Sequence, residues 1–92
     1  MKLDRNVNPN GLGKYAILNL RTDTIEWGRV GAPDEFFVVK LRDCHAPAAL
    51  NAYAADIEFV DPEFAEEVRE MARRSGWPRE NGEGSIHAKK PD

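Results

Sequence analysis

The residues of this chain that could take part in chemistry gather where its composition changes, at residues 40–45. An apolar run at residues 36–39 comes before them, and an alanine-rich stretch beginning at Ala46 comes after them. We call residues 40–45 the seam; its charged or reactive members are Lys40, Arg42, Asp43, Cys44 and His45. These residue types allow two kinds of chemistry, nucleophilic catalysis by the thiol or capture of an anion by the basic side chains.

The thiol and the imidazole are the most reactive pair of the seam. A helix N-terminus favours the thiolate form of a cysteine, and a histidine can accept its proton. However, neighbours in sequence seldom face each other, and no oxyanion-hole motif accompanies Cys44 and His45. The pair is more typical of a cysteine near a helix cap and a histidine on the surface. We therefore predict no catalytic residue and no enzyme.

Metal binding is not indicated either. The residues that could hold a metal do not have the spacing of known metal sites. They are Asp43, Cys44, His45 and His87. The sequence predicts no metal site and no cofactor.

Capture of an anion fits the seam better. Lys40 and Arg42 stand at the end of a predicted strand, and Asp43 can cap the helix that follows. Free N–H groups at the start of that helix attract a phosphate or a carboxylate, although Pro47 removes one donor. Charges at a strand end can also serve solubility alone. The predicted ligand-binding residues are Lys40, Arg42, Asp43, His45, Tyr53, Lys89 and Lys90, the last two in a tail that orders on the ligand.

The bulk composition narrows the class of protein. With 92 residues, the chain is predicted to form a single domain over residues 1–92. A formal net charge of -3 argues against general nucleic-acid binding. The single cysteine cannot form an internal disulfide, so a cytoplasmic location is expected. No apolar run is long enough to span a bilayer, and no membrane association is predicted.

The pattern of apolar residues predicts an α+β fold, with a small antiparallel three-stranded sheet followed by two helices packed on one face. Residues 14–21 alternate with a period of two, and residues 24–27 return after a turn at Thr22 and Asp23. The β-branched and aromatic residues at 36–42 favour a third strand. The ordered core is predicted at about residues 14–76, with a mobile arm at 1–13 and a mobile tail at 77–92.

Two helices are predicted after the seam. The first begins between Asp43 and Ala46, because Pro47 is tolerated only in a first turn. Its predicted inward residues are Ala46, Ala49, Leu50, Tyr53, Ala54 and Ile57. The second begins after Asp61 and ends at Gly76, with the inward residues Phe64, Val68, Met71 and Ala72. A rival interpretation makes residues 36–56 one helix bent at Pro47, which gives a mainly α-helical hairpin.

Four segments of the sequence resemble a family of short, poorly characterised proteins encoded by tailed bacteriophages and prophages. They are "KYAILNLR", "EFFVVKLRDCHAPAALNAYAAD", "DPEFAEEV" and the closing "KKPD". The resemblance implies an accessory protein, in some cases directed against host defence, that acts in the host cytoplasm and is not an enzyme. It implies as partner a host protein or a small anionic ligand such as a signalling nucleotide.

A structural or assembly protein that acts through homo-oligomerisation is the alternative function. A three-stranded sheet with helices on one face leaves the other face uncovered, and that face would carry apolar residues. They are Tyr15, Ile17, Phe36 and Val38. We therefore expect the chain to form a homo-oligomer.

Overall fold

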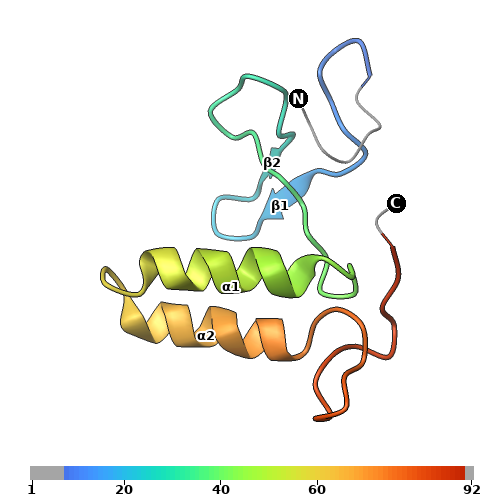
Figure 1. The fold of residues 1–92 in the computed structure, drawn as a ribbon. Helices are drawn as coiled ribbons and strands as arrows, with labels where there is room; N and C mark the ends of the chain where they lie inside the picture. The colour runs from blue at the N-terminus through green and yellow to red at the C-terminus, as the bar shows by residue number, and fades with distance from the viewer. Residues whose placement is uncertain (1–7, 91–92) are drawn as a thin grey trace. The chain divides into compact units, whose positions relative to one another are not determined.

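A computed structural model describes residues 8–90, in the order β1, β2, α1, α2 (Figure 1). The contacts divide the chain into two units, one up to Val38 and one from Val39 onward. We call them the hairpin unit and the helical unit and describe each by itself. The predicted arm at residues 1–13 lies mostly outside the described residues.

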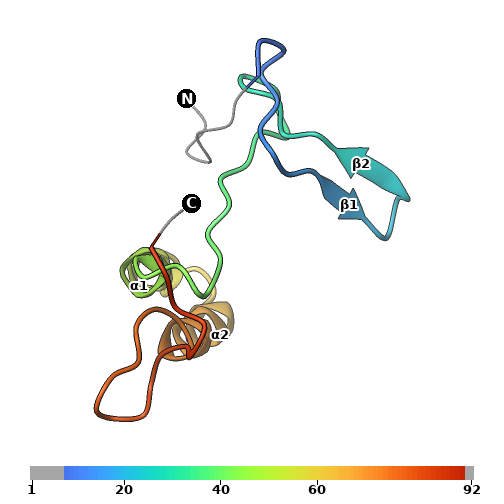
Figure 2. The ribbon, with the colours of Figure 1, turned by 90° about the vertical axis from the view of Figure 1, so that its right-hand side faces the viewer.

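The hairpin unit is built around two short strands (Figure 2). β1, Ile17–Asn19, pairs antiparallel with β2, Thr24–Glu26, and Leu18 lies opposite Ile25. The turn between them is closed by Asn19, whose Oδ1 accepts from the N–H groups of Arg21 and Thr22 at 3.0 and 3.3 Å. These strands confirm the first two predicted strands and the turn between them.

The hairpin unit buries few of its side chains. Gly28 is the only residue between 8 and 38 that is fully buried. The ring of Phe36 lies against it, and a Cβ built on Gly28 would come within 2.2 Å of that ring. The large apolar side chains that stay exposed are Ile17, Leu18, Leu20, Ile25, Trp27, Val30 and Phe37. An isolated two-stranded hairpin is marginally stable in water, so this unit owes little of its stability to a core of its own.

The third strand predicted at residues 36–42 is wrong. β1 and β2 make up the sheet of the described chain. Residues 35–40 have no regular secondary structure, and Leu41 and Arg42 lie in a turn that the bond from Asp43 N–H to the Lys40 carbonyl closes at 2.9 Å. β-branched and aromatic residues favour extended backbone, but a strand also needs a neighbour for its N–H and C=O groups. Residues 36–42 pair with no strand in the described chain; the carbonyls of Leu41 and Arg42 instead accept single bonds from the N–H groups of Gly76 and Lys89.

The helical unit contains two antiparallel helices that pack side by side (Figures 1 and 2). α1, Ala46–Ile57, begins after His45 with Pro47 in its first turn. α2, Pro62–Arg73, begins after Asp61, whose Oδ1 accepts from the N–H of Phe64 at 3.1 Å. The core between them consists of Ala54, Ala65 and Val68, with Leu50, Ile57 and Met71 packed around it. Alanine at two core positions lets the helix axes approach closely.

Both helix starts agree with the sequence predictions, so the rival helix over residues 36–56 is wrong. The predicted inward stripes are only partly right: Ala49, Tyr53 and Phe64 are exposed, and the buried Ala65 was not predicted. The first helix has no side-chain cap. Asp43 instead accepts from the N–H of His45 at 2.8 Å and closes the turn before the helix.

The predicted packing of the helices on a sheet is not confirmed. α1 packs on α2, and β1 pairs with β2. Within residues 8–90, no helix is long and apolar enough to cross a lipid bilayer.

Candidate functional site

Backbone hydrogen bonds join the seam to the end of α2 and to the C-terminal segment, residues 85–90. The N–H of Gly76, just after α2, donates to the carbonyl of Leu41 at 2.9 Å. The N–H of Lys89 donates to the carbonyl of Arg42 at 2.8 Å, and the carbonyl of Lys89 accepts from the N–H of Cys44 at 3.0 Å. The seam is therefore fixed by two segments that lie far from it in the sequence.

A glycine lets the end of α2 approach the start of α1. Gly76 has a φ of +74°, and a Cβ built on it would come within 2.6 Å of the Pro47 ring. The carbonyl of Gly76 also accepts from the N–H of Ser85 at 2.8 Å. A larger residue at this position would disturb the seam, α1 and the C-terminal segment together.

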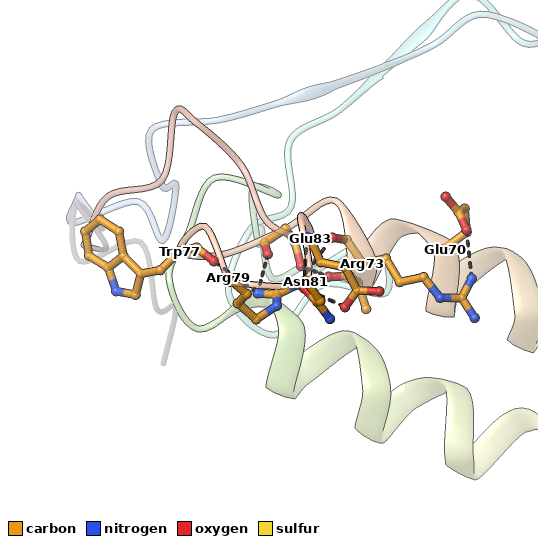
Figure 3. Close-up of polar contacts among 8 residues, drawn as sticks. Glu70, Arg73, Trp77, Arg79, Asn81 and Glu83 are labelled. Carbon is orange, nitrogen blue, oxygen red and sulfur yellow. Dashed lines mark hydrogen bonds and ion pairs between the residues drawn. The ribbon is translucent and has the colours of Figure 1, made fainter.

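One guanidinium holds the loop that leads from α2 to the C-terminal segment (Figure 3). Nη1 of Arg79 donates to the carbonyls of Ser75 and Trp77 at 3.0 and 3.2 Å. Its Nη2 donates to the carbonyl of Arg73 at 3.2 Å and lies 3.9 Å from the Glu83 carboxylate. The last carbonyls of a helix lack partners in the helix and form the negative end of its dipole, so they suit a cation. Arg79 therefore acts as a side-chain cap for α2.

The same loop needs a glycine where it turns back toward the seam. Gly84 has a φ of +106°, and a Cβ there would come within 2.4 Å of the Trp77 carbonyl oxygen. Its N–H donates to the carbonyl of Arg73 at 2.7 Å. Arg79 and Gly84 together bring Ser85 and the residues after it to the seam.

The seam and the C-terminal segment line an open cavity of about 400 Å³. Its lining residues are Lys40, Leu41, Arg42, Ser85 and His87. Two of them are cations, a hydroxyl and an imidazole add hydrogen-bonding groups, and none is acidic. A cavity with this lining favours an anionic group over a neutral or cationic one.

Arg42 shows a local defect in hydrogen bonding. Its Nε is buried and has no hydrogen-bond partner among the described residues. A buried donor without an acceptor costs about 1–3 kcal/mol, and such a group in a folded protein calls for an explanation. A rotation of the guanidinium toward the cavity would turn Nε–H and one Nη–H together toward an anion. This is the paired geometry in which arginine binds carboxylates and phosphates.

The structure places the predicted ligand-binding residues in three groups. Lys40 and Arg42 line the cavity. Asp43 and Lys89 are joined by a β-bridge beside it; His45 lies two residues after Asp43, and Lys90 follows Lys89. Tyr53 is not a lining residue; it lies on α1 and makes an edge-to-face contact with Phe64, with ring centroids 6.1 Å apart.

Sequence reasoning missed Ser85 and His87 as lining residues. The backbone of Lys89 bonds to Arg42 and Cys44 of the seam, whereas the sequence predicted that Lys89 and Lys90 order on a bound ligand, which stays a prediction. Ser85 and His87 lie in a turn that the bond from the Ala88 N–H to the Ser85 carbonyl closes at 3.2 Å. No short pattern in the sequence indicates that this turn reaches the cavity.

The remaining reactive groups lie outside the cavity. Cys44 is a free, half-buried cysteine that does not line it. Among residues 8–90, no three or more His, Cys, Asp or Glu side chains gather closely enough to hold a metal ion. On α2, the side-chain hydrogen bonds with Glu70 and then Glu66 raise the pKa of Arg73 above its ordinary value. That ion-pair cluster stabilises the exposed side of α2 and takes no part in the cavity.

In comparisons with known proteins, no family model, no curated protein and no solved structure matches the chain.

Proposed function

We propose that this chain is a non-enzymatic binding protein that captures an anionic ligand such as a signalling nucleotide in the cavity at the seam. In keeping with the resemblance of its sequence, we propose that it is a phage accessory protein that acts in the host cytoplasm, where removal of a signalling nucleotide would counter a host defence.

The observation that carries this proposal is the state of Arg42. Its buried Nε–H lacks an acceptor, and the residue lines a cavity together with Lys40 and His87. A phosphate group bound there would satisfy the arginine donor and bring its negative charge close to two cations. Both contributions favour the bound state, because a charge-assisted hydrogen bond is about twice as strong as a neutral one.

The size and the mixed lining of the cavity support a small ligand. About 400 Å³ lies within the range of roughly 300–1,000 Å³ that small-molecule sites occupy. Leu41 adds an apolar surface beside the basic residues, against which a base or a sugar could pack. A phosphate joined to an organic group therefore fits the lining better than a bare inorganic ion.

A binding role is also favoured over catalysis by the placing of the thiol. The cavity is lined by neither Cys44 nor His45, and the N–H of each donates to a backbone or side-chain oxygen of the seam or the tail. A nucleophile must reach the bound ligand to react with it.

The first experiment identifies the ligand and the second locates it. Native mass spectrometry of the full chain with a panel of cyclic, linear and diphosphate nucleotides selects the tightest ligand. Calorimetric titration then compares the wild type with Arg42→Ala and Lys40→Ala. The control is Arg74→Ala, which removes the same charge at an exposed position of the helical unit outside the cavity.

Both cavity variants should bind about ten- to hundredfold more weakly, with the larger loss for Arg42→Ala, while Arg74→Ala binds like the wild type. Equal affinities in all four proteins would contradict the proposal and would assign Lys40 and Arg42 to solubility. If the chain binds an acidic host polypeptide and none of the nucleotides, the proposal of a small ligand is contradicted.

A further inference from the structure

The turn between α1 and α2 presents apolar side chains that the helical unit does not use. In this turn, residues 58–61, Phe59 is 93% exposed and Val60 is 84% exposed. The turn is held by bonds from the N–H groups of Val60 and Asp61 to the Ile57 carbonyl, both at 2.9 Å. Glu58 is further tied to Arg69 at 2.9 Å. Because the turn is held by these contacts, little conformational entropy would be lost when it docks on a partner. We call Phe59 and Val60 the knob.

The surroundings of the knob are acidic. No lysine or arginine occurs between Ala46 and Val68, while six carboxylates do. Four of them lie within three residues of the knob, namely Asp56, Glu58, Asp61 and Glu63. Glu58 is paired with Arg69, so the net negative charge around the knob comes from Asp56, Asp61 and Glu63. A surface that accepts the knob must therefore combine apolar area with positive charge. An anionic membrane lacks that charge and would repel the turn.

The opposite end of the same unit has that combination. The seam cavity contains apolar Leu41 among basic residues, and Ile86, which follows Ser85 and precedes His87 in the sequence, is 89% exposed without being a lining residue. We call the cavity and Ile86 the socket. In Figure 1 the turn between α1 and α2 lies at one end of the helix pair, and the start of α1, which the seam precedes, lies at the other end. Since α1 has 12 residues, the ends are roughly 18 Å apart, and a knob cannot reach the socket of its own chain.

We propose that the knob of one copy docks into the socket of a second copy, so that the chain associates head to tail. The contact joins apolar to apolar surface and an acidic to a basic rim, which sets its orientation. It joins different surfaces of the two copies, so the contact is heterologous. This inference names the macromolecular partner of the proposed anion cavity and rests on that cavity being an accessible site. A bound anion and a docked knob would then exclude each other.

The test is sedimentation of the full chain as a function of concentration. The wild type should associate at low ionic strength and dissociate in about 1 M salt, where the screening length falls to roughly 3 Å. The knob variant Phe59→Ser/Val60→Ser and the socket variant Arg42→Glu should each weaken association about tenfold or more. The control is Leu20→Ser, which removes a similarly exposed apolar side chain from the hairpin unit and should leave association unchanged.

The most decisive experiment mixes the knob variant with the socket variant. The knob variant keeps its socket and the socket variant keeps its knob, so the mixture should form a one-to-one dimer although neither forms it alone. A monomeric wild type up to about 1 mM, a mixture that stays monomeric, or association lost only in Leu20→Ser would each overturn the proposal.

The anion cavity is tested separately in the same samples. The knob variant should still bind the nucleotide, and the nucleotide should dissociate the wild-type assembly. If the chain binds the nucleotide but does not self-associate, the proposed head-to-tail contact is wrong and the proposed function stands. If the chain self-associates through Phe59 and Arg42 but binds no nucleotide, the proposed function is wrong and the proposed contact stands.

Discussion

In the helical unit Ala54, Ala65 and Val68 lie buried between two helices, whereas in the hairpin unit the paired residues Leu18 and Ile25 remain about half exposed. Both units have apolar residues at regular spacing. The difference is that a helix pair supplies a second layer for burial, while two strands supply only one. Regularly spaced apolar residues therefore form a core only where a second element packs over them. The stability of the chain should come mainly from the helical unit, and the cavity belongs to that unit.

The largest effect is expected from a charge placed in the helical core. Val68→Asp puts a carboxylate among apolar side chains and should lower the free energy of unfolding by about 3–5 kcal/mol, a large part of the roughly 5–15 kcal/mol that stabilises a typical domain. Val60→Asp makes the same chemical change on the exposed turn and should shift it by less than about 0.5 kcal/mol. Thermal unfolding followed by circular dichroism measures both. Similar losses in the two variants would contradict the assignment of the core.

The second prediction concerns the side chain that caps α2. Arg79→Ala removes donors to four carbonyls around the end of the helix and should cost about 1.5–3 kcal/mol. Hydrogen exchange at the amides of Gly84 and Ser85 should accelerate, because their loop loses its anchor, and anion affinity should fall with it. Arg74→Ala is the control for lost charge. If exchange at these amides is unchanged, Arg79 does not position the loop.

A turn substitution tests whether the hairpin contributes to the stability of the helical unit. Asp23 has a φ of +56°, a conformation that a β-branched residue tolerates poorly. Asp23→Val should destabilise the hairpin by about 1–3 kcal/mol and weaken the cross-strand nuclear Overhauser effects between Leu18 and Ile25. The melting temperature of the helices should stay the same. Asp23→Asn, which tolerates this φ, should keep the hairpin signals; a drop in helix melting with Asp23→Val would show that the units depend on each other.

The smallest effect is expected at the cysteine. Cys44→Ala keeps the backbone N–H that donates to the Lys89 carbonyl and should leave anion affinity unchanged. Cys44→Pro removes that N–H and should loosen the C-terminal segment and weaken anion binding. Calorimetric titration of both variants compares the roles of thiol and backbone. Lost binding in Cys44→Ala with an unchanged melting temperature would show that the thiol itself acts on the ligand.

Local signals in the sequence were enough to predict the helices. Pro47, Asp61 and Pro62 define helix starts through bonds within a few residues, and the helix period follows from the same local pattern. The failed prediction at residues 36–42 concerns a property that is not local. Phe36 packs on Gly28, and the carbonyl of Leu41 accepts a hydrogen bond from the N–H of Gly76. No short pattern in the sequence predicts either contact.

The candidate site was predictable in part for the same reason. Lys40 and Arg42 stand out because they follow an apolar run and precede a helix. Ser85 and His87 reach the cavity through a loop held by Arg79 and Gly84, whose contacts with the end of α2 are visible only in three dimensions. The charge pattern thus predicted the basic half of the cavity, and the path of the loop determines the other half.

The most direct test of an anion site at the seam is a nuclear magnetic resonance titration of the full, isotope-labelled chain with inorganic pyrophosphate, which is small enough to enter any accessible part of the cavity. Amide signals of residues 41–44 and 85–89 should shift together and saturate, while those of β2, Thr24–Glu26, shift no more than the change in ionic strength requires. Arg42→Ala should abolish the saturation. Shifts spread evenly over all lysines and arginines, or shifts that persist in Arg42→Ala, would contradict an anion site at the seam.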